Sequence, residues 1–267
     1  SMFAELCCTS NFTFLTGASH PEEYVMRAHT LGYSGIGVTD EASVSGAVRA
    51  HLASQTLNIP MVHGSRFRID EQLELTFLAP KRKAWGELGQ LISLARRRSS
   101  KGAYQLTRRD LIGHTETLLC LWHPHPQALD WTSQIESLSY AFRGRFWIAA
   151  HLPESGHQAD LAERIDLTAF EWNLPVVATQ RPLMHIRQRL KLQHTLTAIR
   201  LGAPIIEIAD QLERSSERTL MDQHGLKQRY PSAWLHESLN ILDRFDFSLS
   251  DLRYELSLIH ISEPTRR

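Results

Sequence analysis

The sequence predicts an α/β protein whose centre is a barrel or barrel-like sheet of about seven strands. Short apolar runs rich in β-branched residues alternate with segments of helical periodicity, which is typical of parallel β/α units. A chain of 267 residues can bury a large core, as one α/β barrel or as two smaller domains. Its composition, 42% hydrophobic and 22% charged, is that of an ordinary globular protein.

Seven segments are expected to form the strands. They are residues 4–7, 35–39, 60–69, 73–78, 117–121, 146–150 and 175–178. The run that ends at residue 70 and the run at 73–78 follow each other closely, so a hairpin is expected there rather than a βαβ crossover. Ser19, Pro21 and Glu22 predict the start of the first helix through a capping box, and Gly32 predicts its end.

Composition also excludes several classes of protein. No apolar run approaches the roughly 20 residues that a membrane helix needs. The first residues do not resemble a signal peptide, and three cysteines are too few for a disulfide framework, so a cytoplasmic location is expected. Lys plus Arg number 29, and so do Asp plus Glu. This zero net charge argues against the chain being the main nucleic-acid-binding surface of a protein.

Fourteen histidines first suggest a metal-rich hydrolase site. His123 and His125 form a His-x-His pattern that could lie at a barrel mouth, but no acidic partner is evident and a surface loop is favoured. His151 ends the strand predicted at 146–150, where a hydrogen-bonded structural role is favoured over metal ligation. The basic run 96–98 is expected to be part of a loop and a solvated face, because aromatic residues do not interleave with it.

Several ordered blocks of sequence carry a family resemblance. Residues 4–23, which read AELCCTSNFTFLTGASHPEE, resemble the opening of the PHP domain (polymerase and histidinol phosphatase) of bacterial DNA polymerase III α-type subunits. The likeness is greatest to their error-prone, damage-inducible paralogues. Further blocks at 36–41, 49–51, 91–98, 184–187, 196–202 and 247–255 agree. The resemblance implies a distorted (β/α)7 barrel of PHP type with a mostly helical C-terminal extension.

The same resemblance suggests how the chain is divided. Residues 1–185 would be the PHP barrel core, and residues 186–255 the helical C-terminal part of the PHP region. Residues 256–267 resemble a translated sequencing adapter and are expected to be a non-native tail.

A PHP phosphoesterase holds metal ions at the C-terminal ends of its strands through blocks of His, Asp and Glu. The resemblance therefore implies a vestigial site, because most of the expected ligands are replaced here. The positions concerned are held by Cys7, Thr9, Asp40, Glu41, Arg66, His151, Arg181 and Leu183. Only Asp40 is retained, and Cys7 could still ligate as a thiolate.

The two arginines in this set argue against a metal. A guanidinium is permanently cationic, and two unit charges about 4 Å apart interact by roughly 4 kcal/mol at an effective dielectric near 20, a repulsion that a divalent ion would feel about twice over. No metal is expected, and Arg66 and Arg181 are expected to replace the cations by pairing with Asp40 and Glu41.

The resemblance implies a parent enzyme, a DNA polymerase that uses Mg²⁺ in a separate polymerase domain. No catalytic or cofactor-binding residue is expected in this chain, which would be a structural and docking module. Its partners would be the polymerase domain of the same chain and, through the parent, DNA, the sliding clamp and other mutagenic repair proteins, with no membrane. One alternative is an active phosphoesterase or proofreading nuclease. Another is a nucleic-acid-binding module that uses the loop at Arg96–Arg98.

Overall fold

The computed structural model describes residues 3–70, 72–99, 104–154, 158–246 and 249–252. The expected tail at 256–267 lies outside these residues. One sheet contains seven strands in chain order. The strands are β1 (Ala4–Cys8), β2 (Gly35–Val38), β3 (Met61–Ile69), β4 (Leu73–Leu78), β5 (Leu119–Trp122), β6 (Phe146–Ala150) and β7 (Val176–Ala178). Each predicted strand is confirmed, with ends that differ by at most two residues.

The sheet is parallel except around β4, which pairs antiparallel with both β3 and β5. The predicted hairpin is therefore confirmed. Only residues 70–72 join β3 to β4, and a parallel connection would need a dozen or more residues. This reversed strand is the main distortion of the barrel.

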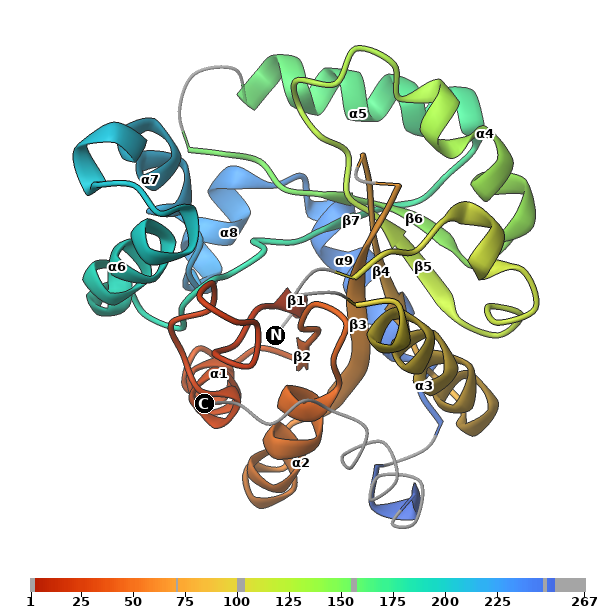
Figure 1. The fold of residues 1–267 in the computed structure, drawn as a ribbon, viewed down its shortest axis with the longest axis horizontal. Coiled ribbons are helices and arrows are strands. Elements are labelled where there is room, and N and C mark those ends of the chain that lie inside the picture. Colours follow the sequence, from red (N-terminus) through yellow and green to blue (C-terminus); the bar gives the residue numbers. More distant parts are fainter. Residues whose placement is uncertain (1–2, 71, 100–103, 155–157, 247–248, 253–267) are drawn as a thin grey trace.

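Helices surround the strands (Figure 1). In the first part of the chain they are α1 (Pro21–Thr30), α2 (Ser45–Leu57), α3 (Arg82–Arg97), α4 (Thr132–Ala141) and α5 (Gln158–Trp172). The later region is mostly helical, as expected, and contains α6 (Leu190–Leu201), α7 (Ala209–Ser215), α8 (Gln223–Arg229) and α9 (Ser232–Leu242). Among the described residues, every helix is too short or too polar to cross a bilayer.

The first helix begins one residue later than the sequence pattern suggests. Its N-cap is His20, whose backbone N–H donates to Oε1 of Glu23 at 2.9 Å. Pro21 then occupies the first helical position, where a missing N–H costs nothing.

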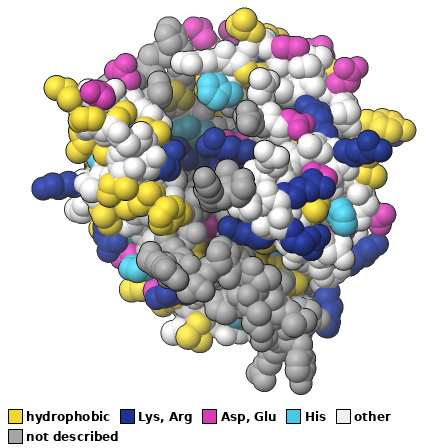
Figure 2. Space-filling model, viewed as in Figure 1, with side chains coloured by type: hydrophobic (Ala, Val, Ile, Leu, Met, Phe, Trp, Pro, Cys, Tyr) yellow, Lys and Arg dark blue, Asp and Glu magenta, His cyan; other side chains and the backbone are white. Residues whose placement is uncertain are grey.

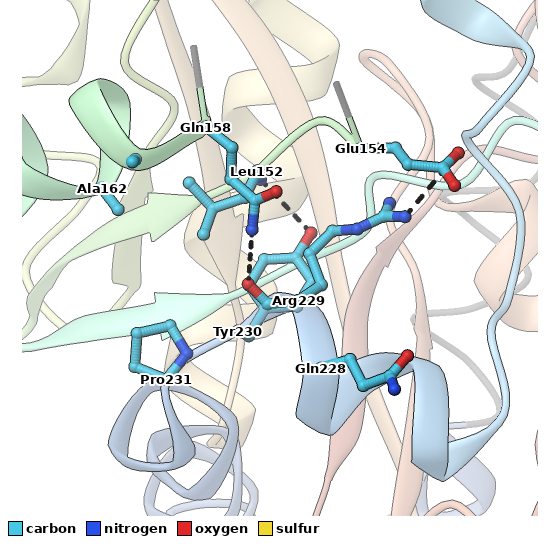
Figure 3. A pocket seen from close by; sticks show the side chains of 9 residues that line it. Leu152, Glu154, Gln158, Ala162, Gln228, Arg229, Tyr230 and Pro231 are labelled. Atoms are coloured by element: carbon cyan, nitrogen blue, oxygen red, sulfur yellow. Dashed lines mark hydrogen bonds and ion pairs between the residues drawn. The ribbon is translucent and has the colours of Figure 1, made fainter. Parts of the chain in front are cut away.

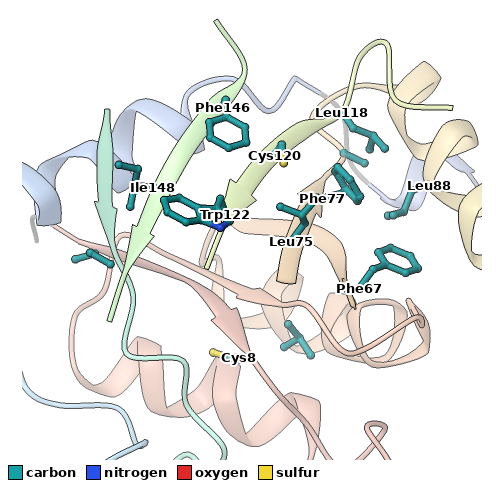
Figure 4. Packing of buried hydrophobic residues seen from close by; sticks show 14 of the residues in the cluster. Cys8, Phe67, Leu75, Phe77, Leu88, Leu118, Cys120, Trp122, Phe146 and Ile148 are labelled. Carbon is teal, nitrogen blue, oxygen red and sulfur yellow. The ribbon is translucent and has the colours of Figure 1, made fainter. Parts of the chain in front are cut away.

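The strands bury side chains on both faces. Side chains of the outer face pack against the surrounding helices and include Phe67, Leu75, Phe77, Trp122, Phe146 and Ile148 (Figure 4). Alternate residues such as Leu121, Trp147 and Ala149 fill the inside of the barrel. This two-sided burial explains why the strands read as continuous apolar runs rather than as alternating patterns.

Helix α9 covers the N-terminal ends of the strands. Ile241 joins the cluster inside the barrel, and the hydroxyl of Ser238 accepts a hydrogen bond from the backbone N–H of Ala4 at 2.9 Å. The segment expected to be an extension therefore contributes to the barrel's own core. The opposite end, where the strands finish, is left for the predicted site residues.

Candidate functional site

The sequence-predicted positions gather at one end of the barrel. Cys7 and Thr9 lie at the end of β1, Asp40 and Glu41 follow β2, His151 follows β6, Arg181 and Leu183 follow β7, and Arg66 lies within β3. We call this end the mouth. The fold thus brings together residues that are as far as 176 positions apart in the sequence, from Cys7 to Leu183.

Asp40 is buried and is held by hydroxyl groups. Its Oδ1 accepts hydrogen bonds from the backbone N–H of Ser10 and the hydroxyl of Thr13, both at 2.7 Å, and its Oδ2 accepts one from the hydroxyl of Ser10 at 2.6 Å. Burial raises the pKa of Asp40 despite these bonds. The expected ion pair between Asp40 and an arginine is wrong, since none forms within the described part of the chain.

Glu41 does pair with Arg66, as expected. Their side chains approach to 3.8 Å, and Arg68 lies 3.7 Å from the same carboxylate. Tyr104 adds a hydrogen bond to Glu41 at 2.8 Å. Burial alone would raise the pKa of Glu41, but Arg66, Tyr104 and Arg68 outweigh it and lower that pKa. The carboxylate therefore stays ionised next to cationic side chains.

Glu74 is the anion that sequence reasoning missed. Its Oε1 lies 3.4 Å from Nη1 of Arg66 and also accepts a hydrogen bond from Nη2 of Arg181. Arg181 therefore pairs with Glu74, and its expected partners Asp40 and Glu41 are wrong. A signal was available, because Glu74 is the one charged residue of β4 and stands between the buried Leu73 and Leu75.

Two histidines lie at the mouth, of which His123 is buried and His151 is partly exposed. His123 is only 5% exposed, so the surface loop favoured for it is wrong. Its Nε2 lies 2.7 Å from the hydroxyl of Thr76, and burial and the nearby Arg66 lower its pKa to about 3. Nδ1 of His151 lies 3.3 Å from the carbonyl oxygen of Thr179, and burial lowers the pKa of His151 to about 3 as well. Both imidazoles are neutral at physiological pH.

The remaining predicted positions carry no acidic or imidazole ligand. Burial and the neighbouring Glu5 raise the pKa of the Cys7 thiol to about 12, which opposes the thiolate form that binds metals. Thr9 uses its backbone, donating to the carbonyl of Pro182 at 2.9 Å. Leu183 is buried in a small apolar cluster with Ala18 and Met184.

The donor set does not suit a divalent metal ion. Within the described ranges, no three His, Cys, Asp or Glu side chains converge as a metal site would require. A third arginine, Arg218, donates from Nε to the carbonyl of Arg181 at 2.8 Å and lies close enough to Arg66 for the two charges to interact. A metal at the mouth would meet cations where it needs anionic ligands.

A separate surface hollow of about 520 Å³ lies beside β6 and α5 (Figure 3). Its polar groups are largely paired with one another. The side chain of Gln158 donates to the carbonyl of Arg229 at 3.0 Å, and the guanidinium of Arg229 lies 3.9 Å from Glu154. It brings together no nucleophile and base, so the mouth remains the better candidate.

The basic run at residues 96–98, considered above as a nucleic-acid-binding loop, uses two of its three arginine side chains for contacts within the protein. Arg96 and Arg97 lie in the last turn of α3, and Arg98 is its C-cap, so the loop expected there is wrong for these residues. Arg96 donates to the carbonyl of Ala42 at 2.7 Å, and Arg98 forms an ion pair with Asp110.

Comparison with known proteins identifies the family and the fold of this chain. The model of the PHP domain matches residues 5–163 of this chain. The chain belongs to the PHP domain family. A structure of a predicted metal-dependent phosphoesterase from Bifidobacterium adolescentis superposes with a TM-score of 0.54 at 13% identity, over 67% of this chain and 86% of that one. This likeness concerns the fold alone.

Curated relatives of this PHP domain are much longer than the chain. An error-prone DNA polymerase from Methylococcus capsulatus is 41% identical over 256 residues, which is 96% of this chain and 24% of the relative. One from Alkalilimnicola ehrlichii is 42% identical over 263 residues, 95% of this chain and 25% of the relative. The chain therefore spans about a quarter of the length of these relatives.

Proposed function

We propose that this PHP domain is the N-terminal part of an error-prone DNA polymerase that takes part in translesion synthesis and DNA repair. In this proposal its metal site is degenerate and the domain is a structural and docking module. The observation that carries the proposal is the pairing of Arg66 and Arg181 through Glu74, at the end of the barrel where a PHP phosphoesterase holds its metals. The identity to error-prone DNA polymerases over nearly the whole chain supports the parent assignment.

In this proposal, catalysis belongs to the rest of the parent chain. Nucleotide addition there would use Mg²⁺, which stabilises both the attacking and leaving oxygens in phosphoryl transfer. DNA, the sliding clamp and other mutagenic repair proteins would be reached through the parent. The cysteines Cys7, Cys8 and Cys120 are buried and unpaired, which suits the reducing cytoplasm that we propose for it.

An apolar surface offers a place for the polymerase domain to dock. It comprises Leu192 and Ile199, which share one face of α6, with Ile205 and Ile206 just after the helix, and Ile206 is 85% exposed. Figure 2 shows apolar side chains gathered on this side of the molecule. Neighbouring exposed apolar side chains of this kind are typical of interaction surfaces. We call them the α6 surface and propose that another part of the parent chain covers them.

The docking role can be tested in the full-length parent. The substitution Ile206→Glu should loosen the domain, so limited proteolysis between the PHP domain and the remainder should become faster. Leu129→Glu is a matched control, because Leu129 is 98% exposed and lies outside the α6 surface. Equal protease resistance in the two variants would contradict docking through this surface.

The degenerate site can be tested by metal analysis and activity. We expect far less than one zinc or manganese per purified chain, and no metal-dependent hydrolysis of a phosphomonoester or of single-stranded DNA. Stoichiometric metal, together with hydrolysis that Asp40→Ala abolishes, would instead establish the phosphoesterase or proofreading nuclease. Asp40 is the right position to change because it is the one carboxylate retained from the expected ligand blocks.

A further inference from the structure

The mouth contains more positive charge than its carboxylates balance. Arg66, Arg181 and Arg218 lie close enough for their charges to interact. Arg66 and Arg181 share Glu74, and Arg66 also reaches Glu41, which is itself shared with another arginine. No carboxylate of the described residues lies within ion-pairing distance of Arg218. Within the described residues, the guanidinium of Arg218 therefore has a backbone carbonyl, and no carboxylate, as its partner.

The guanidinium groups of the mouth repel one another, and a bound anion would reduce this repulsion. Burial and the neighbouring Arg66 lower the pKa of Arg218 to about 10, so it stays protonated at neutral pH under repulsion from its neighbours. Burial, Arg218 and Arg66 likewise lower the pKa of Arg181. Cations withdrawn from water are stabilised mainly by a counter-charge with good hydrogen-bond geometry. The cluster thus has the electrostatics of an anion site.

We infer that the mouth binds a phosphate group, held chiefly by Arg218 and Arg181. Guanidinium groups match phosphate oxygens with paired N–H donors, which makes arginine the preferred side chain for this ligand. Figure 2 shows Lys and Arg side chains across the middle of the face that lies over the strands in Figure 1. The inference rests on the proposed absence of metal, because the arginines then replace the metal as the positive groups.

A neutral donor is also available beside the arginines. Nε2 of His123 faces the hydroxyl of Thr76, and its buried Nδ1 has no hydrogen-bond partner among the residues that the structure describes. When the Thr76 hydroxyl donates to Nε2, the ring carries its proton on Nδ1 and can donate to a phosphate oxygen. An unsatisfied buried polar atom is costly, so a ligand that satisfies it gains affinity.

The ligand could be free phosphate or the terminal phosphate of a nucleic-acid strand. Three probes distinguish these sources, namely inorganic phosphate, a 5′-phosphorylated single-stranded oligonucleotide and the same oligonucleotide without that phosphate. Binding is measured by calorimetry on the 267-residue chain, before and after treatment with a chelator and at constant ionic strength set with chloride. We expect saturable binding of at least one phosphorylated probe and none of the unphosphorylated strand.

Two substitutions, at Arg218 and at Glu74, test whether the arginines of the mouth bind the phosphate, and a third serves as a control. Arg218→Gln should weaken phosphate binding about tenfold or more, because one charged hydrogen-bonding partner is lost. The matched control Arg109→Gln removes one charge from an exposed arginine outside the mouth and should change the affinity by less than about twofold. Glu74→Gln should strengthen binding, because it frees Arg66 and Arg181 from their shared carboxylate. This opposite change tests the inference even if Arg218→Gln does not fold.

Each outcome separates the inference from the proposed function. Binding that survives chelation and depends on Arg218 supports both. If the protein binds no phosphorylated probe either before or after chelation, or if Arg218→Gln and Arg109→Gln bind phosphate equally, the inference is overturned while the docking role stands. If the untreated protein binds a phosphorylated probe and chelation abolishes that binding, a metal holds the phosphate, which overturns both the inference and the degenerate site.

Discussion

The carboxylate of Glu5 accepts a hydrogen bond from the backbone N–H of Gln180 at 2.7 Å, which joins β1 to the chain that leaves β7. These strands are the two ends of the sheet and do not pair with each other among the described residues. Glu5 also accepts from the hydroxyl of Thr179 at 2.7 Å and from the backbone N–H of Cys7 at 3.0 Å. This buried side chain, together with the bond from the backbone N–H of Thr9 to the carbonyl of Pro182, joins the two ends of the sheet where a strand ladder is missing.

We expect Glu5→Gln to lower the free energy of unfolding by roughly 1–3 kcal/mol. The carboxylate is fully buried and each of its oxygens faces donors, so an amide would turn its own NH₂ toward some of them. Urea unfolding at neutral pH checks this. Glu171→Gln is the control, because Glu171 is exposed and should change the value by less than about 0.5 kcal/mol. Equal stability of the two variants would show that the hydrogen bonds of Glu5 between β1 and the chain after β7 do not stabilise the protein.

Glycines at two helical positions should respond oppositely to alanine. A Cβ at Gly46 of α2 would lie 2.2 Å from Oδ2 of Asp40 and 2.9 Å from the hydroxyl of Ser10, whereas a Cβ at Gly86 of α3 would meet nothing within 4 Å. Gly46→Ala should destabilise the protein by about 1–3 kcal/mol through overpacking. Gly86→Ala should stabilise it by about 0.5–1 kcal/mol through helix propensity. Thermal unfolding of both variants checks the pair, and a stabilised Gly46→Ala would mean that Asp40 has room to move.

The sequence predicted the strands because they depend on local signals, whereas the family resemblance implied that the site positions gather at the C-terminal ends of the strands. Strand boundaries follow from apolar runs, and the hairpin at β3 and β4 follows from a very short connection. The pairing of Arg66 with Glu41 also follows, since Glu41 comes directly after β2 and β2 lies beside β3.

Contacts at the mouth that depend on tertiary packing were not predicted. Arg181 and Glu74 are 107 positions apart, and nothing in either local pattern indicates that the reversed strand β4 presents Glu74 to the chain after β7. Asp40 accepts hydrogen bonds from Ser10 and Thr13 because the turn after β1 places these two residues next to its carboxylate. The prediction that His123 lies in a surface loop was wrong because its burial also depends on tertiary packing. Its hydrogen-bond partner, Thr76, lies on another strand.

The three cysteines should be unreactive in the folded protein. Burial and Glu5 raise the pKa of Cys7 to about 12, and burial raises the pKa of Cys8 and Cys120 as well. Since the thiolate is the reactive form, a disulfide reagent at mildly alkaline pH should label the native chain only slowly. In concentrated guanidinium chloride it should label three thiols at once. Fast labelling of a native thiol would mean that the β1 region opens far more often than its burial implies.

Acid should destabilise the protein partly through His123. Burial and Arg66 lower its folded-state pKa to about 3, whereas the unfolded side chain has a pKa near 6.5. Between these two pH values the His123 side chain is protonated in the unfolded state but neutral in the folded state. The contribution of His123 to the free energy of unfolding is therefore fully present above about pH 6.5 and is lost as the pH falls toward 3. The loss is about 1.4 kcal/mol per pH unit for one such histidine.

Replacing His123 with asparagine should therefore make urea unfolding less sensitive to acid between about pH 6.5 and pH 4. The variant is expected to be less stable than the unmodified chain at neutral pH, because its shorter side chain no longer fills the site beside Thr76. The difference should shrink by roughly 1 kcal/mol or more as the pH falls through this window. His125→Asn is the control, since His125 is exposed two residues further along the same loop. An unchanged gap between His123→Asn and the unmodified chain across the window would mean that His123 takes up its proton in the folded state as readily as in the unfolded one.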